Sequence, residues 1–255
     1  MKNLKTITVL ITIVLTSINV RSQEKKIDYN QGMDPVLKTV RLQTAKLQNQ
    51  TTKYLVYVVL PNGAMGDISI WERSVELTDE EIIIKQSWKN QDKSKTREIF
   101  SINDRKTFLP KYHKAVSGKG VIEAYDFYED KIVGSDSIAN NTKKDFNLVL
   151  DKKGIPLNWE LDLELFQKLP YQINRTFSLY FYHPGGKTPP KDYDYRVIRE
   201  EQLSTSYGKI DSWVLQIIYD EEKGSKATFW IRKKDNMMVK MLEQYGPIKR
   251  IKQLL

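Results

Sequence analysis

The 255-residue chain has 41 Lys and Arg against 32 Asp and Glu, a formal net charge of +9, and no cysteine. The lack of cysteine excludes disulfides, thiolate metal sites, a cysteine nucleophile and the lipid-bearing cysteine of bacterial lipoproteins. Basic residues are interleaved with acids along the chain, which is typical of a solvated surface, so we expect no nucleic-acid partner.

Residues 1–22 show the features of a secretory signal peptide in the usual order. Two lysines begin it, residues 6–18 form a short uncharged run, and small residues precede a cleavage site between Ser22 and Gln23. The run is shorter than the roughly 20 apolar residues of a bilayer span, although an uncleaved anchor or a buried helix are alternatives. We predict a periplasmic or secreted protein whose mature chain, residues 23–255, is a single β-rich domain without a transmembrane span.

The first half of the mature chain predicts strands separated by short turns. Residues 30–52 fit a short N-terminal helix or an extended arm. Beyond them, β-branched and aromatic residues alternate with polar ones, and each run ends at turn-forming residues. The expected strands are residues 53–60, 67–77, 81–88, 95–102, 108–116, 121–128 and 131–137.

The central stretch NWELDLELFQKLP, residues 158–170, fits two structures. Its first half alternates like a strand, whereas Leu161, Leu165 and Leu169 recur every four residues and Pro170 is a natural helix stop. We favour a short helix over residues 162–169, packed on one face of the sheet.

The last third again predicts a meander of strands. These strands are residues 177–182, 195–203, 211–219, 227–233, 237–243 and 248–254, with an exposed Pro-Gly loop, HPGGKTPPKD, at 183–192. In ATFWIRKKDNMMVKMLE, residues 227–243, we expect a hairpin that turns at 233–236 and has a wet outer side. The whole pattern indicates a mainly β fold: an antiparallel sandwich, barrel or strongly curved sheet.

Residue types that carry chemistry are sparse. His113 and His183 have no partner at metal-ligand spacing, and we interpret both as surface or turn histidines. The segment around Gly118 and Gly120 fails the phosphate-loop spacing and predicts a hairpin turn. We therefore predict no catalytic residue, no metal and no cofactor.

Three carboxylates in the central stretch are the strongest catalytic alternative. Glu160, Asp162 and Glu164 would share one face of a strand, and paired acids can hydrolyse glycosides. Our preferred interpretation is the solvated edge of an amphipathic segment.

Four segments of the C-terminal half resemble an uncharacterised family of exported Gram-negative bacterial proteins. In order, they are LDLELFQKLP, FSLYFYHPGG, KIDSWVLQI and ATFWIRKKDNMMVKM, within residues 155–250. That family is similar in fold to the periplasmic lipoprotein-localisation carrier and its outer-membrane receptor. The resemblance implies a curved antiparallel sheet or half-open β-barrel, with one or two short helices packed over an apolar cavity. The receptor role implies a lipid anchor, for which this chain lacks the cysteine.

Three functions follow from these observations. The first is a non-enzymatic binding protein that holds a hydrophobic or lipid-like ligand in the concavity, with Trp71, Trp159, Phe166 and Trp230 as candidate ligand-binding residues. The second is a cell-envelope interaction module that contacts an envelope protein through the Pro-Gly loop. The third is a hydrolase of envelope polysaccharide that uses Asp162 or Glu164.

Overall fold

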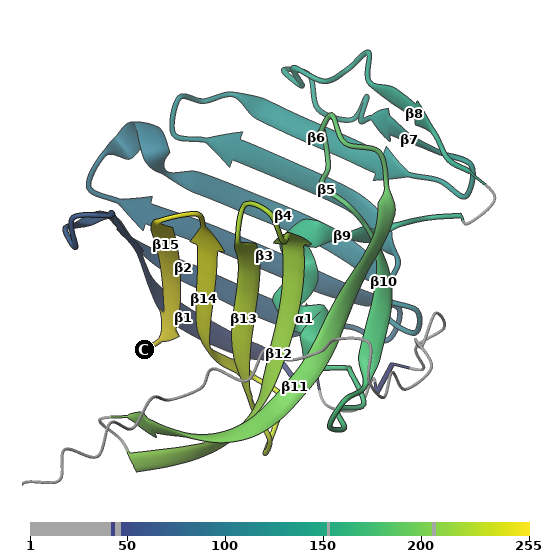
Figure 1. The fold of residues 1–255 in the computed structure, drawn as a ribbon. Helices are drawn as coiled ribbons and strands as arrows, with labels where there is room; N and C mark the ends of the chain where they lie inside the picture. The colour runs from purple at the N-terminus through teal and green to yellow at the C-terminus, as the bar shows by residue number, and fades with distance from the viewer. Residues whose placement is uncertain (1–41, 44–46, 152–153, 206–207) are drawn as a thin grey trace, which may run out of the picture. The chain divides into compact units, whose positions relative to one another are not determined.

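One curved sheet of fifteen strands dominates the computed structural model (Figure 1). The structure describes residues 42–43, 47–151, 154–205 and 208–255, which lie in one unit, Gly32–Leu255. The strands of the first half are β1 (Gln50–Val59), β2 (Met65–Leu77), β3 (Glu81–Asn90), β4 (Arg97–Asp104), β5 (Pro110–Ser117), β6 (Ile122–Phe127), β7 (Lys131–Gly134) and β8 (Asn147–Val149). Those of the second half are β9 (Leu157–Asn158), β10 (Thr176–Tyr182), β11 (Lys191–Thr205), β12 (Gly208–Asp220), β13 (Ser225–Arg232), β14 (Met238–Tyr245) and β15 (Ile248–Leu254).

The sheet runs in the order β8-β7-β6-β5-β4-β3-β2-β1-β15-β14-β13-β12-β11-β10-β9. All neighbours are antiparallel except β9 and β10. The first and last of the strands in sequence, β1 and β15, pair in the middle of the sheet, with Tyr54 opposite Leu254. The edges β8 and β9 do not pair with each other, so the sheet is open rather than a closed barrel. The predicted mainly β, curved antiparallel fold is confirmed.

Most predicted strands are confirmed to within a few residues. The short edge strands β8 and β9 were not predicted, and β7 ends at Gly134, before the expected residue 137. The predicted N-terminal helix or arm lies mostly outside the described residues, as does the predicted signal peptide.

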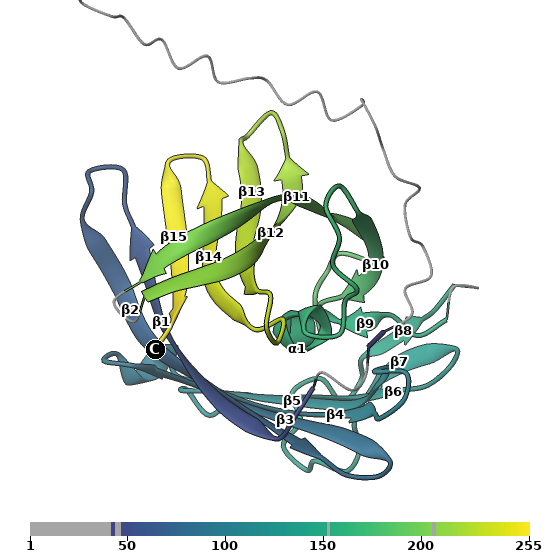
Figure 2. The same cartoon turned by 90° about the horizontal axis from the view of Figure 1, so that it is seen from below.

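Helix α1 (Asp162–Phe166) lies in the concavity of the sheet, after the 3₁₀ turn η3 (Trp159–Leu161) (Figure 2). A second 3₁₀ turn, η2 (Lys93–Lys95), joins β3 to β4. The predicted helix is thus confirmed in place, although it ends at Phe166, and the strand alternative is wrong. Residues 161–169 are all buried, so the interpretation of this segment as a solvated edge is also wrong. The main core fills the space between α1 and the concave face, where Leu165 and Phe166 meet Phe229 and Tyr195.

A second apolar cluster covers the other face of the C-terminal strands. Trp230, Val214 and Val239 are buried there, and Leu203 and Ile210 from the long β11–β12 hairpin pack against them (Figure 2). The β13–β14 hairpin and its turn are confirmed, but its predicted wet outer side is wrong. The reason is that the far end of the β11–β12 hairpin covers this face.

Candidate functional site

A cavity of about 640 Å³ opens between η3, α1, the Pro-Gly loop and the concave face of the sheet. This volume lies within the range of small-ligand pockets, which is about 300–1,000 Å³. Much of its wall is aromatic: Trp71, Trp88, Trp159, Phe181, Tyr182, Tyr193, Tyr219, Phe229 and Tyr245. His183 and charged side chains complete it: Arg97, Glu160, Asp162, Lys187, Glu243, Arg250 and Lys252.

Strand alternation places these side chains on one wall. Successive strand residues point to opposite faces, so every second residue faces the concavity. In β14 these are Met241, Glu243 and Tyr245, and in the neighbouring β15 they are Arg250 and Lys252. The same register brings Trp71 of β2 opposite Trp88 of β3, where the two rings stack with centroids 4.4 Å apart.

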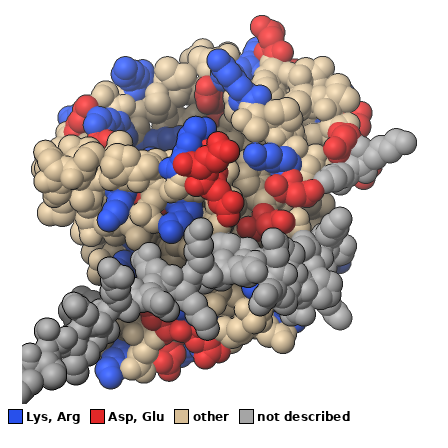
Figure 3. All heavy atoms as spheres, in the orientation of Figure 1, with Lys and Arg blue, Asp and Glu red and all other residues tan. Residues whose placement is uncertain are grey.

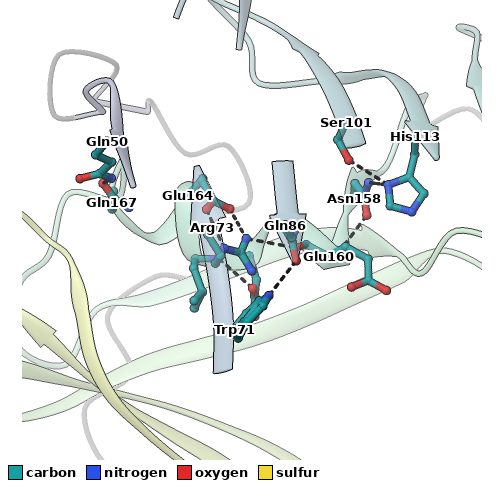
Figure 4. Close-up of polar contacts among 12 residues, drawn as sticks. Gln50, Trp71, Arg73, Gln86, Ser101, His113, Asn158, Glu160, Glu164 and Gln167 are labelled. Carbon is teal, nitrogen blue, oxygen red and sulfur yellow. Dashed lines mark hydrogen bonds and ion pairs between the residues drawn. The ribbon is translucent and has the colours of Figure 1, made fainter. Parts of the chain in front are cut away.

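A buried ion pair holds α1 against β2 (Figure 4). Arg73 donates from Nε to Glu164 Oε1 at 2.8 Å, and its Nη2 contacts the other carboxylate oxygen. The same Nη2 donates to the backbone oxygen of Glu160 at 3.1 Å. Glu164 is therefore a structural residue that anchors the helix.

Gln86 fixes the preceding turn η3 in the same way. Its Nε2 donates to Glu160 O at 2.8 Å, while its Oε1 accepts from Trp71 Nε1 at 3.1 Å (Figure 4). One side chain thus links the cavity wall of β2 to the backbone of η3. At the other end of the helix segment, Asn236 donates to the backbone oxygens of Gln167 and Leu169 at 3.3 and 3.0 Å.

His113 is buried on β5, which overturns its interpretation as a surface histidine. Its Nδ1 lies 2.9 Å from Ser101 Oγ and 3.0 Å from Asn158 Nδ2 (Figure 4). Burial lowers the pKa of His113 to about 4, so the imidazole is neutral at physiological pH. Asn158 also accepts from the Glu160 amide at 3.0 Å and caps η3. This contact gives His113 a structural role in placing the turn.

Two of the cavity carboxylates, Glu160 and Glu243, each contact an arginine and one further side chain. Glu160 pairs with Arg97 at 2.8 Å and with His183 at 3.2 Å. Burial alone would raise the pKa of Glu160, but Arg97 above all, together with the two neighbouring histidines, outweighs it and the pKa is lowered. Glu243 pairs with Arg250 at 3.1 Å and accepts from Tyr245 Oη.

Asp162 and Lys252 differ from those pairs. The carboxylate of Asp162 accepts from the Leu163 amide at 2.8 Å, and burial raises its pKa to about 6. The Lys252 ammonium lies 4.3 Å from the Trp71 ring centroid and 5.7 Å from that of Trp88. Burial lowers the pKa of Lys252, and the charges of Asp162 and, to a smaller extent, Glu243 oppose this.

The Pro-Gly loop between β10 and β11 is part of the cavity wall. His183, Lys187 and Pro189 face the cavity. Gly185 holds the loop close to the sheet: its φ is +74°, and a Cβ there would lie 2.1 Å from Tyr125 Oη. A loop is confirmed at this position, but it is attached to the fold through a close backbone approach that requires glycine.

The four predicted ligand-binding residues separate into two groups. Trp71 and Trp159 line the cavity. Phe166 lies in the core against Tyr195 and Phe229, and Trp230 lies on the opposite face of the sheet. The cavity residues that sequence reasoning missed, Lys252 above all, belong to strands that lie far apart in the chain.

No cluster of three or more His, Asp or Glu side chains in the described ranges is arranged to hold a metal ion. Nor does any described helix have the length and apolar character needed to cross a membrane. Lys and Arg side chains lie among Asp and Glu over the visible face of the molecule (Figure 3).

A family model described as a protein of unknown function (DUF3108) matches residues 53–251, which is most of the sheet and the cavity wall except Lys252. The chain belongs to the DUF3108 family. The predicted membership in an uncharacterised family is confirmed in this form, while the export of its members and their relation to the lipoprotein-localisation carrier stay predictions. The comparison with curated proteins gave no match.

A solved structure also matches this DUF3108 chain. It is the crystal structure, at 1.75 Å resolution, of a DUF1329 family protein from Desulfovibrio piger ATCC 29098. The match has a TM-score of 0.34 and 8% sequence identity, and it covers 84% of this chain and 87% of the other. Similarity at this level says nothing about a ligand or an activity.

Proposed function

We propose that this protein is exported and binds a partly apolar, lipid-like ligand in the cavity beside α1, without transforming it. The observation that carries the proposal is a cavity of about 640 Å³, with aromatic walls, that the protein's own side chains leave open. Desolvation of apolar ligand surface against aromatic rings stabilises a complex by roughly 25 cal/mol per Å² before the costs of association.

The arrangement of the charges supports binding rather than catalysis. Glycoside hydrolysis needs one protonated and one free carboxylate on either side of the scissile bond. Glu164 is enclosed by Arg73, and Glu160 is held by Arg97 and His183. Asp162 is thus the one of the two predicted hydrolase residues that faces the cavity.

The Pro-Gly loop supports the same function. Its position on the cavity wall gives it a role in enclosing the ligand. Contact with an envelope protein through this loop remains the alternative function, with the exposed Lys187 and Thr188 as the reachable residues.

A titration with the neutral fluorescent probe N-phenyl-1-naphthylamine tests the proposal. We expect saturable binding to one site, with affinity weakened about fivefold or more in Trp159→Leu, because that ring contributes apolar contact area to the wall. Trp230→Leu is the matched control, since Trp230 lies on the other face of the sheet. Absence of saturable binding, or equal weakening by both substitutions, would count against a ligand in this cavity.

A further inference from the structure

Asp162 and Lys252 have hydrogen-bonding capacity that the described part of the protein leaves unused. Asp162 is 9% exposed, and its carboxylate accepts only from the adjacent Leu163 amide. Lys252 rests on the rings of Trp71 and Trp88, and within the described ranges its ammonium makes no hydrogen bond or ion pair. Both side chains line the cavity.

Asp162 is buried and Lys252 is half-buried, and a charged group that is even partly removed from water without a partner is costly. The other two carboxylates of the cavity do have partners, because Glu160 and Glu243 each contact two side chains. The amine and the carboxyl are therefore the groups of the wall that a bound molecule is best placed to satisfy. Such a molecule must offer an acceptor to Lys252 and a donor to Asp162.

The rest of the wall indicates what kind of molecule this is. Among the described residues, Met241 and Pro189 are the aliphatic members of the wall, and no Leu, Ile or Val, which suit a flexible acyl chain, lines it. Trp159, Tyr193 and Tyr219 are each half-buried residues that form a connected aromatic group, with the rings of Tyr193 and Tyr219 centred 4.4 Å and 6.2 Å from that of Trp159. Flat aromatic faces beside charged hydrogen-bonding groups suit a ring that has an apolar C–H face and a polar edge.

We propose that the polar part of the ligand is a saccharide ring, which stacks on Trp159 while its hydroxyl groups donate to Asp162 and accept from Lys252. A hydroxyl group can do both, because it carries one donor and two acceptor lone pairs. The ring belongs either to a free oligosaccharide or to the sugar headgroup of a glycolipid. This inference rests on the proposed function and names the chemistry that the cavity recognises.

The test combines three binding measurements on the full chain. A broad glycan array presents free saccharides, dodecyl maltoside below its micelle concentration presents a sugar headgroup with an apolar chain, and dodecanoate presents the chain alone. Each is measured with the wild type, Asp162→Asn and Lys252→Gln. Lys240→Gln is the matched control, because Lys240 also covers a tryptophan ring, that of Trp230, at 5.0 Å, but on the other face. Circular dichroism establishes that all variants fold.

We expect saccharide binding that each cavity variant weakens about tenfold, because each variant loses a hydrogen bond to a charged group. Lys240→Gln should leave this binding unchanged. Array binding points to free saccharides, whereas binding of dodecyl maltoside alone points to a glycolipid headgroup. Binding of dodecanoate and of N-phenyl-1-naphthylamine without any saccharide would overturn the inference and keep the proposed function. Saccharide binding that neither cavity variant weakens would also overturn it. If no probe bound at all, both the saccharide inference and the proposed function would be overturned.

Discussion

Replacing Glu164 by glutamine should destabilise the fold strongly, because it leaves the Arg73 guanidinium buried without its counter-charge. The side chains of the pair are 1% and 3% exposed, so water cannot replace the lost carboxylate. Arginine does not lose its proton at any accessible pH, and removing one partner of such a buried pair typically costs about 3–5 kcal/mol. Asp162 contributes attraction to Arg73, which places the expected loss near the lower end, about 3 kcal/mol.

Urea denaturation followed by far-ultraviolet circular dichroism measures this loss as a change in the free energy of unfolding. Glu76→Gln is the control, because its pair with Lys85 has both side chains more than half exposed, and surface pairs contribute about 0–1 kcal/mol. The double variant Arg73→Met with Glu164→Leu should recover much of the loss, since it removes both charges together. A loss below about 1 kcal/mol in Glu164→Gln would refute the view that this pair anchors α1.

Three further predictions concern the cavity and the segment that forms it. Because burial raises the pKa of Asp162 from 3.8 to about 6, its protonated form adds stability that is complete below pH 3.8 and is lost as the pH rises through 6. Asp162→Asn should therefore be more stable than the wild type at pH 8 by up to about 3 kcal/mol, an advantage that disappears by pH 4 in urea titrations at both pH values. Asn236→Ala should lose about 2–4 kcal/mol in thermal or urea unfolding, because two buried carbonyl groups lose their donor and φ is +57°. Asn236→Gly also removes the side-chain donor, but glycine tolerates the positive φ, so this variant should lose about 1 kcal/mol less than Asn236→Ala. Equal losses in the two variants would contradict a backbone contribution. Gly185→Ala should displace the Pro-Gly loop and weaken N-phenyl-1-naphthylamine binding, whereas unchanged binding would show that the loop does not enclose the cavity.

The strands could be predicted from local pattern because alternation and turn residues act over a few positions. The position of helix α1 could be predicted from its leucine spacing and from Pro170, but the burial of the helix could not be predicted. A short amphipathic helix normally shows one polar face to water, and here the curved sheet encloses that face, so Glu164 needs Arg73 of a distant strand.

The cavity was largely beyond sequence reasoning for a related reason. Trp71 and Trp159 were found because large aromatic residues are frequent in binding sites. Lys252 carries no such signal: it is one of many lysines in an alternating strand, and only the pairing of β15 with β1 and β14 places it beside Trp71. Trp230 resembles Trp71 in sequence context, and what separates them is the β11–β12 hairpin that covers the opposite face.

Native mass spectrometry of the protein purified from a bacterial periplasm, with solvent extraction of the same sample, tests the central claim most directly. The account predicts a reproducible extra mass on the wild type, matched by an extracted amphiphile, that is lost in Trp159→Leu and retained in Trp230→Leu. An apoprotein mass alone, or an extra mass that persists in Trp159→Leu, would contradict a ligand bound in this cavity.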